Sequence, residues 1–155
     1  MTILPITTLL SQPFDCLIIV HPHIDILESA TQNFLETGLF SINIGKELST
    51  ALIPTLYQQR GASAQSWLQQ EISSSVNEPV FCENPHLLFD PSFNIDPLTL
   101  FRQVAHIKKI IVPWLGEYRS KRLSYAEPNH LHYKTWDLSE PVYQQPRIVV
   151  HRIVD

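Results

Sequence analysis

The chain has 155 residues, of which 44% are hydrophobic and 17% charged, and its formal net charge is −4. This length fits one domain with a core of its own, and the net charge gives no overall attraction to nucleic acid. No two of the four glycines lie within six residues of each other. A phosphate-binding loop needs closely spaced glycines to wrap its backbone around an anion, so an intact Walker-type loop and a Rossmann fingerprint are excluded.

Composition also bears on the compartment. No apolar run reaches the ~18 residues of a membrane span, and the first residues lack the cations and the cleavage site of a signal peptide. Cys16 and Cys82 both lie in apolar runs, and we expect them to be buried free thiols. These features predict a cytoplasmic protein without a membrane segment.

The first half of the chain contains two predicted strands, each followed by helical sequence. An apolar run at 14–20 predicts a strand buried on both faces, which is typical of parallel sheets. Helical spacing follows over 25–37, and residues 39–44 form a second strand candidate. Residues 46–59 and 62–75 predict two helices, because a proline and a glycine interrupt a single longer one.

The second half is predicted to add three strands and a helix. Residues 79–82 form a third strand, and a helix over 97–108 begins with Asp96 as its N-cap. Residues 109–114 form a fourth strand, and after a polar stretch residues 147–154 form a last one at a sheet edge. The alternation of strands and helices predicts a single three-layer α/β domain with a mostly parallel sheet.

Ligands of parallel α/β sheets bind beyond the carboxyl ends of the strands. Three of the predicted strands end next to candidate site residues. The first strand ends at His21–Glu28, the third at Glu83 and Asn84, and the fourth at Trp114–Glu117. We expect these three strand ends to lie side by side.

Several long strings of residues surround these strand ends. They are Asn43–Ser49, Phe81–Pro91, Asp96–Leu98, Trp114–Tyr118 and Leu123–His130, followed by Tyr133. Together they resemble BrxF, the small P-loop protein of type 3 BREX phage-defence systems, over most of the chain. The positions that carry the C-terminal signature of that family are Trp114, Gly116, Tyr118, Tyr125, Glu127, His130 and Tyr133.

The resemblance implies a P-loop NTPase-like fold of the AAA-like type, but the loop itself is degenerate. The corresponding stretch reads His21, Pro22, His23, Ile24, Asp25, Ile26, Leu27, Glu28. Leu27 replaces the lysine that would contact the phosphates, and Glu28 replaces the hydroxyl that would hold magnesium. Glu83 stands at the Walker B position beside Asn84 and is interpreted as structural. We therefore expect no catalytic residue and no cofactor.

Two histidine pairs offer metal-ligating nitrogens: His21 with His23, near Asp25, and His130 with His132. Alternate residues of an extended segment point to the same side, as zinc ligands must. Zinc sites generally take at least three protein ligands, so loop histidines without a metal are the favoured interpretation.

Five of the 11 Lys and Arg residues fall within one 15-residue window, namely Lys108, Lys109, Arg119, Lys121 and Arg122. Cations interleaved with Tyr118, Tyr125 and His130 suit phosphate contacts and base stacking. The favoured alternative is a solvated loop whose cations balance Glu117 and Glu127.

The expected function is that of a non-catalytic or accessory subunit of a BREX-type antiviral defence complex. Such a subunit would contact other defence subunits and, through the basic segment, DNA. The alternative is a divergent ATPase that binds ATP and magnesium in a non-standard way. Self-association stays open, because AAA-like proteins often form rings or assemblies.

Overall fold

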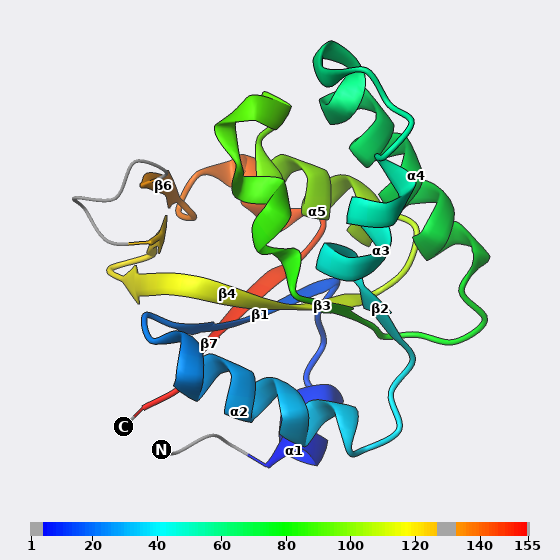
Figure 1. Ribbon diagram of the computed structural model, residues 1–155. Helices are drawn as coiled ribbons and strands as arrows, with labels where there is room; N and C mark the ends of the chain where they lie inside the picture. Colours follow the sequence, from blue (N-terminus) through cyan, green and yellow to red (C-terminus); the bar gives the residue numbers. More distant parts are fainter. Residues whose placement is uncertain (1–4, 127–132, 155) are drawn as a thin grey trace.

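A sheet of parallel strands runs through the middle of the molecule, with helices on both of its faces (Figure 1). The computed structural model describes residues 5–126 and 133–154. The sheet order is β2-β3-β4-β1-β7, and every neighbouring pair is parallel. The strands span Cys16–His21 (β1), Ser41–Asn43 (β2), Val80–Glu83 (β3), Ile110–Arg119 (β4) and Ile148–Arg152 (β7). The predicted three-layer α/β architecture is confirmed, and the last strand lies at a sheet edge as predicted.

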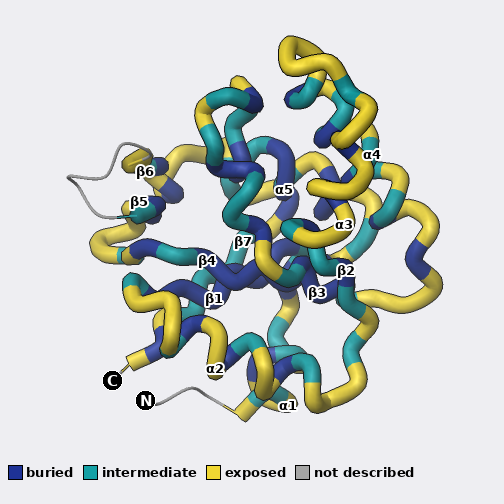
Figure 2. Tube along the Cα trace, viewed as in Figure 1, coloured by how far each residue is buried: buried dark blue, intermediate teal, exposed yellow. Residues whose placement is uncertain are grey.

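Two hydrophobic cores, one on each face of the sheet, hold the layers together (Figure 2). In β1, Cys16, Ile18 and Val20 belong to one core, whereas Leu17 and Ile19 belong to the other. The apolar run therefore buries both sets of alternating side chains, as a central parallel strand requires. Both cysteines are free and buried, which confirms that prediction.

The helices divide between these two cores. The first core contains side chains of α3, α4 and α5, and the second contains side chains of α1 and α2. The helices span Ile6–Ser11 (α1), Ile24–Leu35 (α2), Ile44–Ala51 (α3), Arg60–Ser74 (α4) and Pro97–Ala105 (α5). Short 3-10 helices span Tyr57–Gln59 (η1), Pro85–Phe89 (η2), Pro91–Phe93 (η3) and Pro141–Gln144 (η4).

Local sequence signals set several helix boundaries. Asp96 caps α5 as predicted, because its Oδ2 accepts a hydrogen bond from the Thr99 N–H at 3.3 Å. Helix α3 starts two residues earlier than predicted and ends at Ala51, before Pro54. Its cap is Asn43, whose Oδ1 accepts a hydrogen bond from the Lys46 N–H at 3.0 Å.

The fourth strand continues well beyond its predicted end at Trp114. It runs to Arg119, turns at Ser120 and Lys121, and pairs in antiparallel fashion with β5 (Arg122–Tyr125). Strand β5 in turn pairs with β6 (Lys134–Asp137). Residues 116–125 and 134–137 of the polar stretch between the fourth and last predicted strands therefore form an antiparallel extension of the sheet. Within the described residues, none of the helices has the length and apolarity to cross a membrane.

Candidate functional site

The carboxyl ends of β3, β4 and β1 lie along one edge of the sheet, as the sequence predicted. Val20 and His21 of β1 are in register with Trp114 and Leu115 of β4, and β4 also pairs with β3. Strand β1 leads into α2 on one face of the sheet, whereas η2, which follows β3, packs on the other. The connections that follow β1 and β3, the two parallel neighbours of β4, therefore lie on opposite faces of the sheet at the carboxyl edge, where α/β domains bind ligands.

The connection from β1 to α2 consists of Pro22 and His23 alone. The backbone N–H of His23 donates a hydrogen bond to Nδ1 of His21 at 2.9 Å. His21 is 3% exposed. Asp25 lies in the first turn of α2. The backbone N–H of His23 is therefore already bonded within the turn. In addition, the carboxylate of Asp25 lies at the helix N-terminus, which would otherwise attract a phosphate.

The other positions assigned to the degenerate loop lie within α2. Of these, Leu27 is buried and Glu28 is exposed. From Leu27 onward, the backbone N–H groups of α2 donate to carbonyl oxygens four residues earlier, beginning with the bond from the Leu27 N–H to the His23 oxygen. The segment is therefore a plain strand-to-helix turn.

The structure places the first histidine pair close together. The ring centroids of His21 and His23 are 5.3 Å apart, but Nδ1 of His21 already accepts the His23 N–H. Over residues 5–126 and 133–154, no group of three or more His, Cys, Asp and Glu side chains is arranged to hold a metal ion. His130 and His132 lie outside the described residues.

The structure brings Glu28 and Glu83 to one pocket of about 340 Å³, together with Asn84 and His86. Neither lysine nor arginine is among the described residues that line it. Burial lowers the pKa of His86, so its imidazole is uncharged near neutral pH. The pocket beside the Walker B-like position therefore presents carboxylates and no opposing cation, which is unfavourable for a nucleotide phosphate.

Gly45 allows α3 to approach the end of β3 closely. A Cβ at Gly45 would lie 2.2 Å from Nδ2 of Asn84, which is far inside van der Waals contact. Asn84 itself adopts the left-handed conformation, with φ 53°. The segment Asn43–Ser49 thus meets the Glu83-Asn84 turn, although the two are 40 residues apart in the chain.

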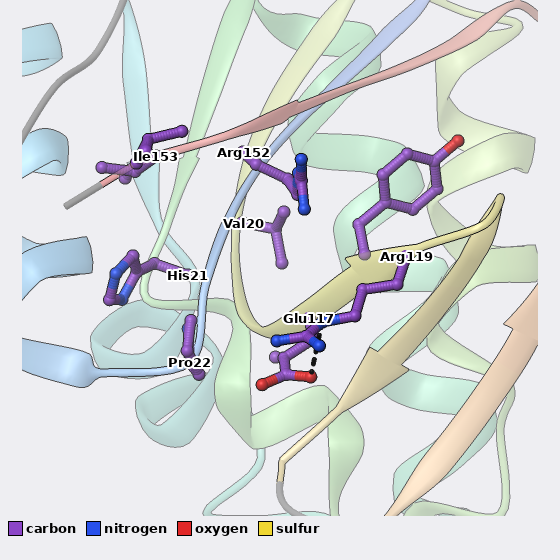
Figure 3. A pocket seen from close by; sticks show the side chains of 10 residues that line it. Val20, His21, Pro22, Glu117, Arg119, Arg152 and Ile153 are labelled. Atoms are coloured by element: carbon purple, nitrogen blue, oxygen red, sulfur yellow. Dashed lines mark ion pairs between the residues drawn. The ribbon is translucent and has the colours of Figure 1, made fainter.

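A second pocket, of about 250 Å³, opens where β4 leaves β1 (Figure 3). Strand β1 ends at His21, opposite Leu115 of β4, whereas β4 continues to Arg119. The pocket lies beyond the end of β1, and Arg152 of β7 and the following Ile153 line its other side. The sequence prediction missed Arg152, although a cation at the carboxyl end of a predicted strand was a usable signal.

The described signature residues mainly build the antiparallel extension. Trp114 is fully buried between Phe89 and Trp136, with ring centroids at 4.8 and 5.3 Å. Tyr125 stacks on Phe89 at 3.9 Å. Trp114 and Tyr125 are therefore core residues and not contact surface. Gly116 is buried as well, whereas Tyr118 is half-buried and Tyr133 is exposed; Glu127 and His130 lie outside the described residues.

The basic segment does not form one patch. Lys108 and Lys109 precede β4, whereas Arg119, Lys121 and Arg122 lie at its far end. A strand of 10 residues is about 30 Å long, so the two groups are far apart. The ammonium of Lys108 donates to the backbone oxygen of Ser75. The five cations of the 15-residue window therefore lie in two separate groups, one at each end of β4.

The cations of the β4–β5 hairpin have acidic neighbours. Arg119 lies 3.5 Å from Glu117. Hydrogen bonds from Ser139 lower the pKa of Asp137, and the nearby Arg122 and Lys121 lower it further. The hairpin thus carries exposed cations whose charge is partly balanced.

Comparisons with models of known protein families, with curated proteins and with solved structures found no match to this chain. The fold and the site define it as a three-layer α/β protein with a mostly parallel sheet and two pockets at the carboxyl edge of that sheet.

Proposed function

We propose that this chain is a non-catalytic, P-loop NTPase-like subunit of a bacterial anti-phage defence complex of the BREX type. The assignment to such a complex rests on the strings of residues that resemble BrxF. The buried first strand, flanked by β4 and β7 and leading directly into a helix, is compatible with a P-loop-like frame.

One observation carries the non-catalytic part of the proposal: the two-residue turn between β1 and α2. Its His23 N–H is bonded to the His21 ring, and Asp25 stands in the first turn of α2. To bind a nucleoside triphosphate, the turn between β1 and α2 would need free backbone N–H donors and a cation. The chain offers a closed turn, an acid and, in the neighbouring pocket, Glu28 and Glu83.

Isothermal titration with ATP and magnesium tests this part. No heat of binding is expected from the purified chain up to millimolar ATP. Binding in the micromolar range would overturn the proposal in favour of a divergent ATPase. A variant with His21→Gly and Asp25→Gly tests whether the turn alone prevents binding, and it is also expected to show none, because no lysine is supplied.

An uncharged, apolar corner of the surface supports contact with another subunit. Ile53 and Leu56, in the connection between α3 and α4, are 80% and 64% exposed. Leu52, next to Ile53, lines a groove of about 550 Å³ whose lining is half apolar, including Trp67, and half uncharged polar, including Gln59. Arg60 is the only charged residue between positions 48 and 70. Exposed apolar surface of this kind marks protein interaction sites, and we assign it to an apolar segment of a neighbouring defence subunit.

Co-expression with the products of adjacent genes tests this contact. Genes for a large ATPase, a methyltransferase and a PglZ-type protein beside this gene are the expected setting. Leu56→Asp should abolish co-purification with one of these products, whereas Val76→Asp, at a position 87% exposed in another loop, should not. Equal co-purification of both variants would contradict the assignment.

DNA contact is the narrower part of the proposal and rests on the exposed cations of the β4–β5 hairpin. An Arg119→Ala/Arg122→Ala variant should lose salt-dependent DNA binding, because each phosphate contact adds to the salt slope. Unchanged binding by this variant would remove the hairpin from the proposed function. A Lys108→Ala variant is the control, since that lysine lies at the other end of β4.

A further inference from the structure

The pocket between β1, β4 and β7 has a charge arrangement that the proposed function does not use. Arg152 reaches it from the end of β7 and Arg119 from the end of β4, and Figure 3 shows both side chains directed toward the same space. This location, beyond the carboxyl ends of parallel strands, is where α/β sheets bind ligands. The pocket lies beyond the end of β1, where β4 continues past Leu115 to Arg119.

The two arginines are not equivalent. Arg119 is paired with Glu117 at 3.5 Å. For Arg152, the described residues place no carboxylate within the 4.0 Å of an ion pair. Counting histidine as neutral, the described lining residues therefore carry one positive charge in excess, and that charge is on Arg152.

The rest of the lining is mostly apolar. Val20, Pro22, Ile153 and Val154 form its walls. A volume of about 250 Å³ is just below the roughly 300–1,000 Å³ of sites for drug-sized ligands, so the ligand must be small. A single excess charge together with apolar walls favours a compact molecule with one anionic group and a short hydrocarbon part.

We propose that this pocket binds a small monocarboxylate. The carboxylate would pair with the guanidinium of Arg152, whose planar donors match two carboxylate oxygens. The hydrocarbon part would lie against Val20, Pro22 and Ile153. A nucleotide is too large and too highly charged for this pocket, so the proposal is separate from the question of ATP binding.

Titration with butyrate, followed by NMR of the ¹⁵N-labelled chain, tests the proposal. Butyrate should shift the amide resonances of Val20 and Ile153, with a dissociation constant in the millimolar range. Butyramide, which has the same shape without the charge, should bind at least tenfold more weakly. Arg152→Gln should weaken butyrate binding at least tenfold, and the matched variant Arg147→Gln, just before the opposite end of β7 and outside the pocket, should bind as the wild type does.

Three results would overturn the proposal. They are equal binding of butyrate and butyramide, unchanged butyrate binding by Arg152→Gln, and the absence of any shift with butyrate up to about 50 mM, far above millimolar dissociation constants. Inorganic phosphate is the competing anion. If phosphate binds at this site and butyrate does not, the pocket is an oxyanion site of another class and the monocarboxylate assignment is wrong.

Discussion

The carboxylate of Asp96 joins α5 to the antiparallel extension, because its Oδ1 accepts a hydrogen bond from Nε1 of Trp136 at 2.8 Å. Its other oxygen, Oδ2, caps α5 through the Thr99 N–H. Lys134 lies 3.7 Å from Oδ1. A single side chain thus serves as helix cap and as the anchor of β6.

Replacing Asp96 should therefore remove two contributions at once. Asp96→Ala is expected to lower the free energy of unfolding by about 2.5–4 kcal/mol, since a cap contributes ~1 kcal/mol and a hydrogen bond to a charged group ~1.5–3 kcal/mol. Asp96→Asn should lose about half as much, because an amide has one acceptor oxygen in place of two. Urea denaturation followed by circular dichroism measures both, and an Ala variant as stable as the wild type would contradict this role.

Gly116 is required by the close approach of β5. A Cβ at Gly116 would lie 1.8 Å from the backbone oxygen of Ser124, which cannot move without breaking the hairpin. Gly116→Ala should destabilise the chain by at least about 3 kcal/mol. Gly45→Ala is the comparison, because the obstructing atom there belongs to the Asn84 side chain. In thermal unfolding, the midpoint temperature of Gly45→Ala should lie clearly above that of Gly116→Ala. The opposite order would count against this explanation.

The β4–β5 turn holds two non-glycine residues in the left-handed region. Ser120 has φ 51° and Lys121 has φ 62°, as in the two-residue hairpin turns that favour Asn-Gly. Lys121→Gly should stabilise the chain by roughly 0.5–1 kcal/mol. Lys46→Gly, on the exposed face of α3, should destabilise it by about 1 kcal/mol. Denaturant midpoints measure both changes in stability. If both glycine variants were destabilised, the turn assignment would be refuted.

The two thiols make stability depend on alkaline pH. Burial raises the pKa of Cys82 from 9.0 to about 12, and it raises the pKa of Cys16 as well. The unfolded chain therefore loses these protons first, and stability should fall between pH 9 and about 12 by about 1.4 kcal/mol per pH unit for each cysteine. Urea denaturation at pH 8 and at several values above 9 tests this.

Cys16→Ala/Cys82→Ala should remove most of the extra slope while lowering stability at every pH. Iodoacetamide should modify neither thiol in the folded protein, since the thiolate is the nucleophile. Rapid labelling of the native chain, or a slope that the double variant retains, would show that the thiols are not the cause.

Parts of the site could be predicted because they follow from local sequence. The turn after β1 lacks glycine, so the residues His21–Glu28 by themselves indicate that a phosphate cradle is absent. The adjacency of the strand ends followed from the rule that parallel strands finish at one edge. That Glu28 and Glu83 line the same pocket could not be predicted, because it depends on where α2 lies relative to the ends of β2 and β3.

The residue pattern alone indicated that β1 is buried on both faces, that Asp96 starts a helix and that no glycine-rich phosphate loop follows β1. These are properties of neighbouring residues, set by hydrophobic pattern, capping and backbone freedom. Tertiary contacts set the rest: β4 continues past Trp114, the two groups of basic residues lie at opposite ends of β4, and Arg152 joins Arg119 at one pocket. The physical reason is that a strand's partners and a pocket's walls come from segments far apart in the chain, so pairing and packing, not local preference, place them.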